Sequence, residues 1–104
     1  MNLGGIKVSS VQIEEVINQL EFIKESAAIA ISPENGGPSQ LVIYAIILPG
    51  NLSNEEQLKQ AKLIIRQRLN PLFKVEKLIA IDLLPRTASG KVMRRKLRDL
   101  YLDN

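Results

Sequence analysis

The sequence predicts an α+β domain, in which helices pack on a small antiparallel-type sheet of about three strands. Two separate segments carry apolar residues at helical spacing, and short runs rich in Val and Ile lie between them. A dense cluster of turn formers at residues 33–39 separates two of these runs. The expected order is β-α-β-β-α-β-loop-α, within a single domain that spans residues 1–104.

The first strand and the first helix follow the glycine pair Gly4-Gly5. Residues 6–8 predict a short strand. Ser9 and Gln12 then have the spacing of a capping box, in which a hydroxyl group at the helix start is paired with an amide three residues later. We expect a helix over about residues 10–20, because its apolar residues recur at helical spacing: Ile13, Val16, Ile17 and Leu20.

A β-hairpin and a second helix form the middle of the chain. Residues 27–32 and 40–48 predict two strands that are joined through the turn-rich segment between them. Ser53 and Glu56 form a second capping-box pattern, and the helix after it carries one apolar stripe. Pro71 limits how far this helix can continue.

The last part of the chain predicts a strand, an irregular loop and a helix. Residues 75–83 form the third strand of the sheet, and Pro, Thr, Ser and Gly crowd into residues 84–90. We expect a final helix from about Lys91 to Tyr101. One face of this helix is apolar, with Met93, Leu97, Leu100 and Tyr101.

Composition excludes several kinds of chemistry. Apolar residues make up 45% of the chain and charged residues 24%, which is typical of a globular domain. The chain has no Cys and no His, so disulfides, zinc–cysteine sites and Ser-His-Asp triads are excluded, and we expect no metal site. The longest apolar run, residues 41–49, is about half of what a membrane span needs. No secretory leader opens the chain, and we expect a cytoplasmic protein.

Positive charge is concentrated near the C-terminus. The segment from residue 85 to residue 98 contains no acidic residue, and it carries Arg86, Lys91, Arg94, Arg95, Lys96 and Arg98. Such a segment favours contact with an anionic group, either the phosphates of a nucleotide or cofactor, or nucleic acid. A solvated helix face is the alternative interpretation, and we interpret Arg94, Arg95 and Arg98 as solvated or interdomain residues. We interpret Glu14 as a helix-dipole residue.

The loop 85–91 contains the strongest candidate for chemistry. Gly90-Lys91 suggests a phosphate-binding P-loop, but that motif needs Gly where Pro85 stands and Ser or Thr where Val92 stands. What remains is a lysine that follows a glycine at the tip of a loop, in a cationic setting. Such a lysine can meet a carboxylate or phosphate oxygen.

Two segments resemble motifs of the adenylate-forming enzymes, the superfamily of acyl-CoA synthetases, nonribosomal-peptide adenylation domains and firefly-type luciferases. Residues 84–98, LPRTASGKVMRRKLR, resemble its final core motif, most closely that of the acetyl- and medium-chain acyl-CoA synthetases. Residues 2–14, NLGGIKVSSVQIE, resemble the motif that follows its interdomain hinge. Because the spacing of the two motifs also fits, the resemblance covers essentially the whole chain. It implies the C-terminal lid domain, without the large N-terminal adenylation domain that would be its partner.

The resemblance also implies roles for individual residues. Lys91 matches the lysine that the lid inserts while a carboxylate attacks the α-phosphate of ATP, and the loop that presents it includes Pro85, Thr87, Ser89 and Gly90. After rotation of the lid, Gly4, Gly5 and Lys7 match the segment that lines the pantetheine tunnel for coenzyme A. Arg66 matches a position that contacts the CoA nucleotide. ATP and CoA are then substrates of the complete enzyme, and Mg²⁺ is bound by the absent N-terminal domain.

Two other functions remain open at the level of the sequence. The lid of a carrier-protein-dependent adenylation domain would have the same fold and hand the acyl group to a protein-bound pantetheine. A small nucleic-acid-binding module would explain the basic segment, although its aromatic residues are dispersed. Gly5 can also be a turn glycine and Lys91 a solvated lysine. Under the lid hypothesis the isolated chain is inactive, and the acyl group is selected by the missing domain.

Overall fold

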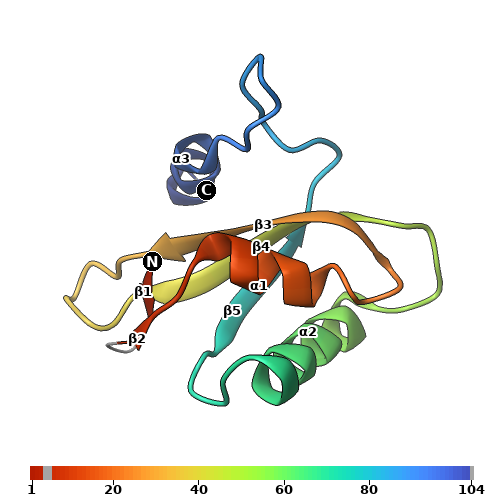
Figure 1. Cartoon of the computed structure of the whole chain (residues 1–104), viewed down its shortest axis with the longest axis horizontal. Coiled ribbons are helices and arrows are strands. Elements are labelled where there is room, and N and C mark those ends of the chain that lie inside the picture. Colours follow the sequence, from red (N-terminus) through yellow and green to blue (C-terminus); the bar gives the residue numbers. More distant parts are fainter. Residues whose placement is uncertain (4–5, 104) are drawn as a thin grey trace.

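The computed structural model describes residues 1–3 and 6–103. The elements are β1 (Asn2–Leu3), β2 (Ile6–Lys7), α1 (Ser10–Ile17), β3 (Ile23–Ile31), β4 (Gln40–Ile47), α2 (Asn54–Arg68), β5 (Val75–Ala80) and α3 (Arg94–Leu102). Figure 1 shows the helices packed on a small sheet, with a loop before α3 that projects away from it. The predicted α+β class is confirmed, and the observed order adds one short strand at the N-terminus.

The three-stranded sheet has the order β3-β4-β5 and is mixed. β3 and β4 form the predicted antiparallel hairpin, whereas β4 and β5 are parallel. The expectation of an antiparallel-type sheet was therefore wrong for this pair. The physical reason is the connection, because α2 carries the chain back so that β5 starts at the same end of the sheet as β4. The predicted first strand does not join this sheet, and β2 pairs with β1 instead.

The two predicted serine caps are confirmed by hydrogen bonds, and the complete capping box is found at α1. Ser9 caps α1 by accepting from the amide of Gln12 at 3.1 Å, and the Gln12 side chain accepts from the Ser9 amide at 3.2 Å. Ser53 caps α2 by accepting from the amide of Glu56 at 3.2 Å. α1 ends at Ile17 rather than near residue 20, because residues 18–20 continue in tighter turns.

Three other element boundaries differ from the sequence prediction. β3 begins at Ile23, four residues earlier than expected, because an edge strand tolerates outward-facing charges such as Lys24. β5 ends at Ala80, which is its last residue paired with β4. α3 begins at Arg94 rather than at Lys91, because residues 85–93 form a small hairpin before it.

The core has two parts, one on each face of the sheet. The first contains α1, α2 and alternate sheet residues, and its largest members include Ile13, Ile17, Leu41, Ile43 and Ile65. The second lies under α3 and contains Ala27, Ile29, Ile31, Val42, Tyr44, Leu84 and Leu97. The central strand β4 therefore has five consecutive buried residues, Leu41 to Ala45, as expected for a strand that is covered on both faces.

A carboxylate of α1 accepts a hydrogen bond from the outer edge of β3. This strand pairs with β4 on one side only, so its other side has backbone amides without a partner strand. Glu14 of α1 accepts a hydrogen bond from the amide of Ala28 at 2.8 Å and also binds Arg94 of α3, with Nη2 2.7 Å from both carboxylate oxygens. One side chain thus joins a helix on one face of the sheet to the helix on the other face.

We predict that Glu14→Ala lowers the free energy of unfolding by about 2–3 kcal/mol, because it leaves both the Ala28 amide and the largely buried Arg94 guanidinium without their acceptor. Glu15→Ala is the matched control, because Glu15 is the adjacent and exposed carboxylate of the same helix. We expect it to change stability by less than about 0.5 kcal/mol. Urea unfolding of the three proteins measures the difference, and equal stability losses for the two variants would contradict the assignment.

Candidate functional site

The segment 85–93, called the lysine hairpin here, is a narrow antiparallel turn. Arg86 and Val92 form its β-bridge. The amide of Thr87 donates to the carbonyl of Lys91 at 2.8 Å, and the amide of Met93 donates to the carbonyl of Pro85 at 2.8 Å. Figure 1 shows this turn extending beyond the sheet and α3. Backbone hydrogen bonds therefore fix the local shape of an otherwise projecting loop.

Hydroxyl groups and a glycine close the tip of the lysine hairpin. The hydroxyl of Thr87 accepts from the amide of Lys91 at 3.1 Å and lies 3.0 Å from the hydroxyl of Ser89. Gly90 has a φ of 88°, in the left-handed region that residues with a Cβ rarely adopt. The amide of Gly90 donates to the carbonyl of Thr87 at 2.9 Å. The small polar residues of the motif thus build the turn that leads into Lys91.

Lys91 lies directly after this turn with its side chain exposed. The base of the hairpin is anchored on both sides, because Leu84 is buried and Val92 packs against the same apolar cluster under α3. Pro85 is half-buried between base and tip. A cation held at the end of a stiff projection can enter a cavity of another domain and meet a carboxylate or phosphate there.

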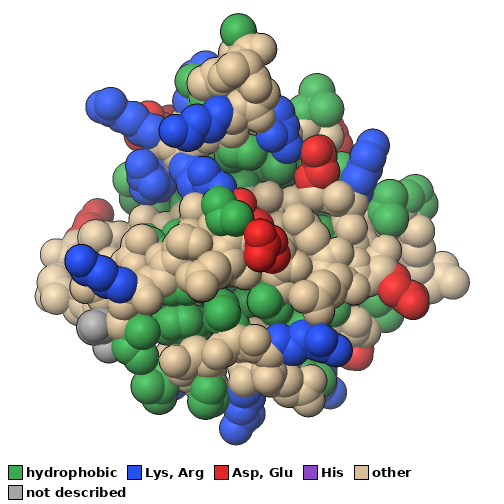
Figure 2. All heavy atoms as spheres, viewed as in Figure 1, with side chains coloured by type: hydrophobic (Ala, Val, Ile, Leu, Met, Phe, Trp, Pro, Cys, Tyr) green, Lys and Arg blue, Asp and Glu red, His purple; other side chains and the backbone are tan. Residues whose placement is uncertain are grey.

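Positive charge gathers around the lysine hairpin and α3, as Figure 2 shows for one face of the molecule. Within this group Arg94 is not the solvated residue that the sequence suggested, since its side chain is 22% exposed and pairs with Glu14. The interpretation of Glu14 as a helix-dipole residue was likewise wrong. Its partner is eighty residues away in the chain, which helical spacing cannot reveal. Lys91, Arg95 and Lys96 are exposed.

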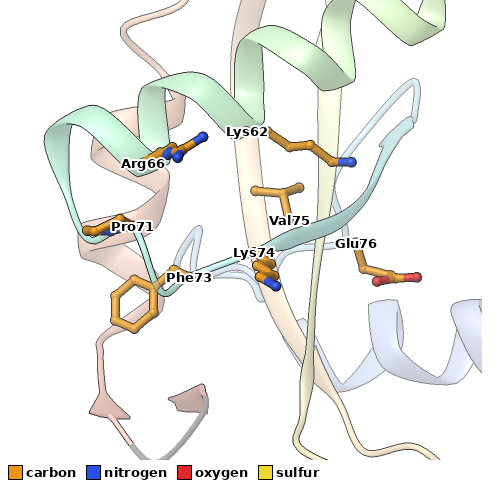
Figure 3. A pocket seen from close by; sticks show the side chains of 7 residues that line it. All are labelled: Lys62, Arg66, Pro71, Phe73, Lys74, Val75 and Glu76. Atoms are coloured by element: carbon orange, nitrogen blue, oxygen red, sulfur yellow. The ribbon is translucent and has the colours of Figure 1, made fainter.

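Arg66 lies in a second basic feature, a surface hollow of about 400 Å³ between α2 and the start of β5. Figure 3 shows Lys62 and Arg66 projecting from α2, with Val75 of β5 pointing toward the helix. Phe73 is buried and Lys74 is exposed, and both line the same hollow. The lining of the hollow thus carries three cations and one carboxylate, Glu76, beside apolar side chains. This positive balance suits an anionic group that is attached to an apolar one.

The third predicted group consists of Gly4, Gly5 and Lys7. Gly4 and Gly5 lie outside the described residues. Lys7 is exposed at the end of β2 and borders a shallow depression that reaches Gln12. Leu3 of β1 and Val8, which follows β2, are buried in the same core cluster as α1 and α2.

The structure therefore brings together only part of the predicted site. Pro85, Thr87, Ser89, Gly90 and Lys91 form one hairpin. Lys7 and Arg66 belong to elements packed on the opposite face of the sheet, and their hollows include none of the hairpin residues. The domain thus has candidate surfaces on both sides of the sheet, and the hollows at Arg66 and at Lys7 share no lining residue.

Sequence reasoning did not assign a role to Arg86 or to Glu25. Arg86 donates to the carbonyl of Gly90 at 2.7 Å and to Glu25 of β3 at 3.0 Å. Of the two residues, Arg86 could be singled out from the sequence, because it lies inside the hairpin motif. Its partner could not be identified, since Glu25 precedes it by sixty-one positions.

The hydroxyl group of Tyr44, which lies in the apolar cluster under α3, stays neutral. Tyr44 is 2% exposed, and this burial raises the pKa of its hydroxyl, with a further increase from the charge of Tyr101. Tyr101 in turn has the ammonium of Lys77 5.5 Å from the centre of its ring. Tyr44 therefore supports the packing of α3 and is not an acid or base for chemistry at neutral pH.

Comparison with known proteins identifies relatives over nearly the whole chain. Residues 12–91 match the family described as AMP-binding enzyme C-terminal domain. The chain is 49% identical over 102 residues to an Arabidopsis thaliana protein named "Probable acyl-activating enzyme 18, peroxisomal", covering 95% of this chain and 14% of that protein. It is 42% identical to the hexanoyl-CoA synthase of Cannabis sativa, covering 97% of this chain and 15% of that one.

A solved structure confirms the fold. The acyl-CoA synthetase of Brucella canis superimposes with a TM-score of 0.86 at 19% identity, over 98% of this chain and 19% of that one. The chain thus spans about one-seventh of the length of the two curated relatives. None of the described helices has the length and hydrophobicity of a membrane span. The cytoplasmic location stays a prediction, since the Arabidopsis relative is named as peroxisomal.

We predict that Gly90→Ala lowers the free energy of local opening of the lysine hairpin by about 1–2 kcal/mol. Alanine is strained at a φ of 88°, although its Cβ would meet open space. The amides of Thr87 and Met93 should then exchange with solvent about 5–30 times faster. Gly50→Ala is the control, because its Cβ also meets open space but its φ is not in the left-handed region. Unchanged exchange in Gly90→Ala would show that the glycine is dispensable for this turn.

Proposed function

Because the chain belongs to the AMP-binding enzyme C-terminal domain family, we propose that it is the mobile lid of an ATP-dependent acyl-CoA synthetase. The observation that carries the proposal is the hydrogen-bonded hairpin that projects from the sheet, with Lys91 exposed directly after its tip. The named relatives activate acyl groups, and each is several times longer than this chain. The lid would therefore act on an N-terminal adenylation domain in the same or a separate chain.

In the first half-reaction, Lys91 acts on a carboxylate and ATP held by that partner domain. The carboxylate oxygen attacks the α-phosphorus, and the bond to the pyrophosphate oxygen breaks. The ammonium of Lys91 aligns the carboxylate and offsets the negative charge that develops on the α-phosphoryl oxygens. Pro85, Thr87, Ser89 and Gly90 contribute by fixing the hairpin that delivers it, as their hydrogen bonds and backbone conformation support.

In the second half-reaction the other face of the domain meets coenzyme A. Gly4, Gly5 and Lys7 line the passage for the pantetheine arm, and the thiol displaces AMP from the acyl-adenylate. Arg66 binds the nucleotide end of CoA, together with Lys62 and Lys74 around the same hollow (Figure 3). Lys7 and Arg66 lie on elements of one sheet face and Lys91 on an element of the other, which supports a lid that rotates between the two steps.

Coenzyme A is the proposed acceptor in preference to a carrier protein, since a relative 42% identical is named as a CoA synthase. Mg²⁺ would neutralise phosphate charge during adenylation. The residues that the structure describes contain no cluster of three or more His, Cys, Asp or Glu side chains. We place the ion in the N-terminal domain. The isolated chain, which lacks that domain, would be inactive.

We predict that Lys91→Ala in the complete enzyme slows acyl-adenylate formation by about 10²–10³, because an electrostatic contact to the developing charge is lost. Thioester formation from supplied acyl-adenylate should be unchanged. Pyrophosphate exchange and thioester formation, measured separately, test the two steps, and the isolated chain provides the inactive background. Lys96→Ala removes an exposed charge from the same basic region and serves as the control. Equal slowing of both half-reactions by Lys91→Ala would contradict the proposed role.

We predict the reverse pattern for Arg66→Ala. The KM for CoA should rise about tenfold, since a charge-assisted hydrogen bond to a phosphate is lost, and pyrophosphate exchange should be unchanged. Arg68→Ala is the control, because Arg68 is an exposed arginine of the same helix that does not line this hollow. An unchanged KM for CoA in Arg66→Ala would remove Arg66 from the CoA site.

A further inference from the structure

We propose that Arg86 is a positioning residue for Lys91, and that Glu25 on β3 holds Arg86 in the position where it does this. The inference rests on the proposed role of Lys91 in adenylation and adds two residues to it. Neither residue would touch a substrate in this proposal. Their effect on the reaction passes entirely through the lysine hairpin.

The guanidinium of Arg86 connects the tip of the lysine hairpin to the sheet. Its Nη1 donates to the carbonyl of Gly90 at 2.7 Å, and its Nη2 donates to Oε1 of Glu25 at 3.0 Å. Gly90 is the residue immediately before Lys91. A planar guanidinium with two donors in fixed relative directions can make both bonds at once, whereas a lysine ammonium has no such fixed fork.

This arginine provides the polar link between hairpin and sheet. Among the described residues, Arg86–Glu25 is the one side-chain hydrogen bond between residues 85–93 and β3–β5. The apolar anchors Leu84 and Val92 lie at the base of the hairpin, where they restrain its two strands. These anchors do not reach the tip, so the direction of the tip is set by Arg86. This residue lies opposite Val92 in the β-bridge and binds Gly90 from there.

The exposure of the pair argues for a geometric role. The side chains of Arg86 and Glu25 are 38% and 44% exposed, and ion pairs of this kind add little to global stability. A bond to the carbonyl next to Lys91 nevertheless restrains where the ammonium can point. Displacement of a reacting group by about 1 Å can cost about 10²-fold in rate, so a weak surface contact here can have a large catalytic effect.

The first experiment measures the geometry in this chain, without any assay of function. We expect Arg86→Gln to speed amide exchange of Gly90 and Thr87 about fivefold or more, with the urea midpoint nearly unchanged. Glu25→Gln should have a smaller effect in the same direction, and none when added to Arg86→Gln. Arg95→Gln, an exposed arginine of α3, is the control. Unchanged exchange in Arg86→Gln would overturn the proposal.

The second experiment measures the reaction in the complete enzyme. Arg86→Gln should lower kcat for pyrophosphate exchange about 10- to 100-fold, with little change in the KM for ATP or in thioester formation from supplied adenylate. Arg86→Lys should not restore the rate, because it cannot make both bonds. The double variant Arg86→Gln/Lys91→Ala should be no slower than Lys91→Ala alone. If the two losses multiply instead, Arg86 acts independently of Lys91 and the proposal is wrong.

The two experiments separate failure of this inference from failure of the proposed function. If Lys91→Ala leaves pyrophosphate exchange unchanged, the adenylation role itself is wrong, whatever Arg86 does. If Lys91→Ala slows exchange but Arg86→Gln does not, the role of Lys91 stands and the positioning role of Arg86 is overturned.

Discussion

The unpaired edge of β3 is the constraint on which the C-terminal part of this domain depends. An edge strand presents backbone amides that need acceptors, and here the carboxylate of Glu14 supplies one for Ala28. The same carboxylate binds Arg94 and so fixes the start of α3. On the same strand, Glu25 binds Arg86 and so reaches the lysine hairpin. One carboxylate of α1 and one of β3 therefore attach the segment that carries Lys91.

The sheet separates the two proposed surfaces as well as supporting them. Because β4 is buried on both faces, elements of the two faces cannot merge into one site within this domain. The helix with Arg66 and the strands β1 and β2 pack on one face, and α3 packs on the other. A rigid domain of this kind can present either surface to a partner by rotating as a whole. This property suits an enzyme that performs two half-reactions in sequence.

The shape of the lysine hairpin is fixed by hydrogen bonds within it, whereas the direction in which the hairpin projects is fixed by contacts with distant residues. Thr87, Ser89 and Gly90 close the turn within the motif itself, so the sequence was sufficient to identify this loop and its exposed lysine. The direction in which the loop projects depends on the packing of Leu84 and Val92 and on Arg86 bound to Glu25. No pattern within residues 84–98 contains that information, because Glu25 belongs to another element.

Local chemistry explains what the sequence by itself determined. The capping residues Ser9 and Ser53 and the motif around Gly90 depend on neighbours within a few positions, and the β3–β4 hairpin joins strands that are consecutive in the chain; all were predicted. Only the tertiary structure decided the parallel pairing of β5, the early start of β3 and the role of Glu14. Each of these depends on which strand lies at an edge and which element packs beside it. Contacts between residues eighty positions apart, such as Glu14 with Arg94, arise only when the chain has folded.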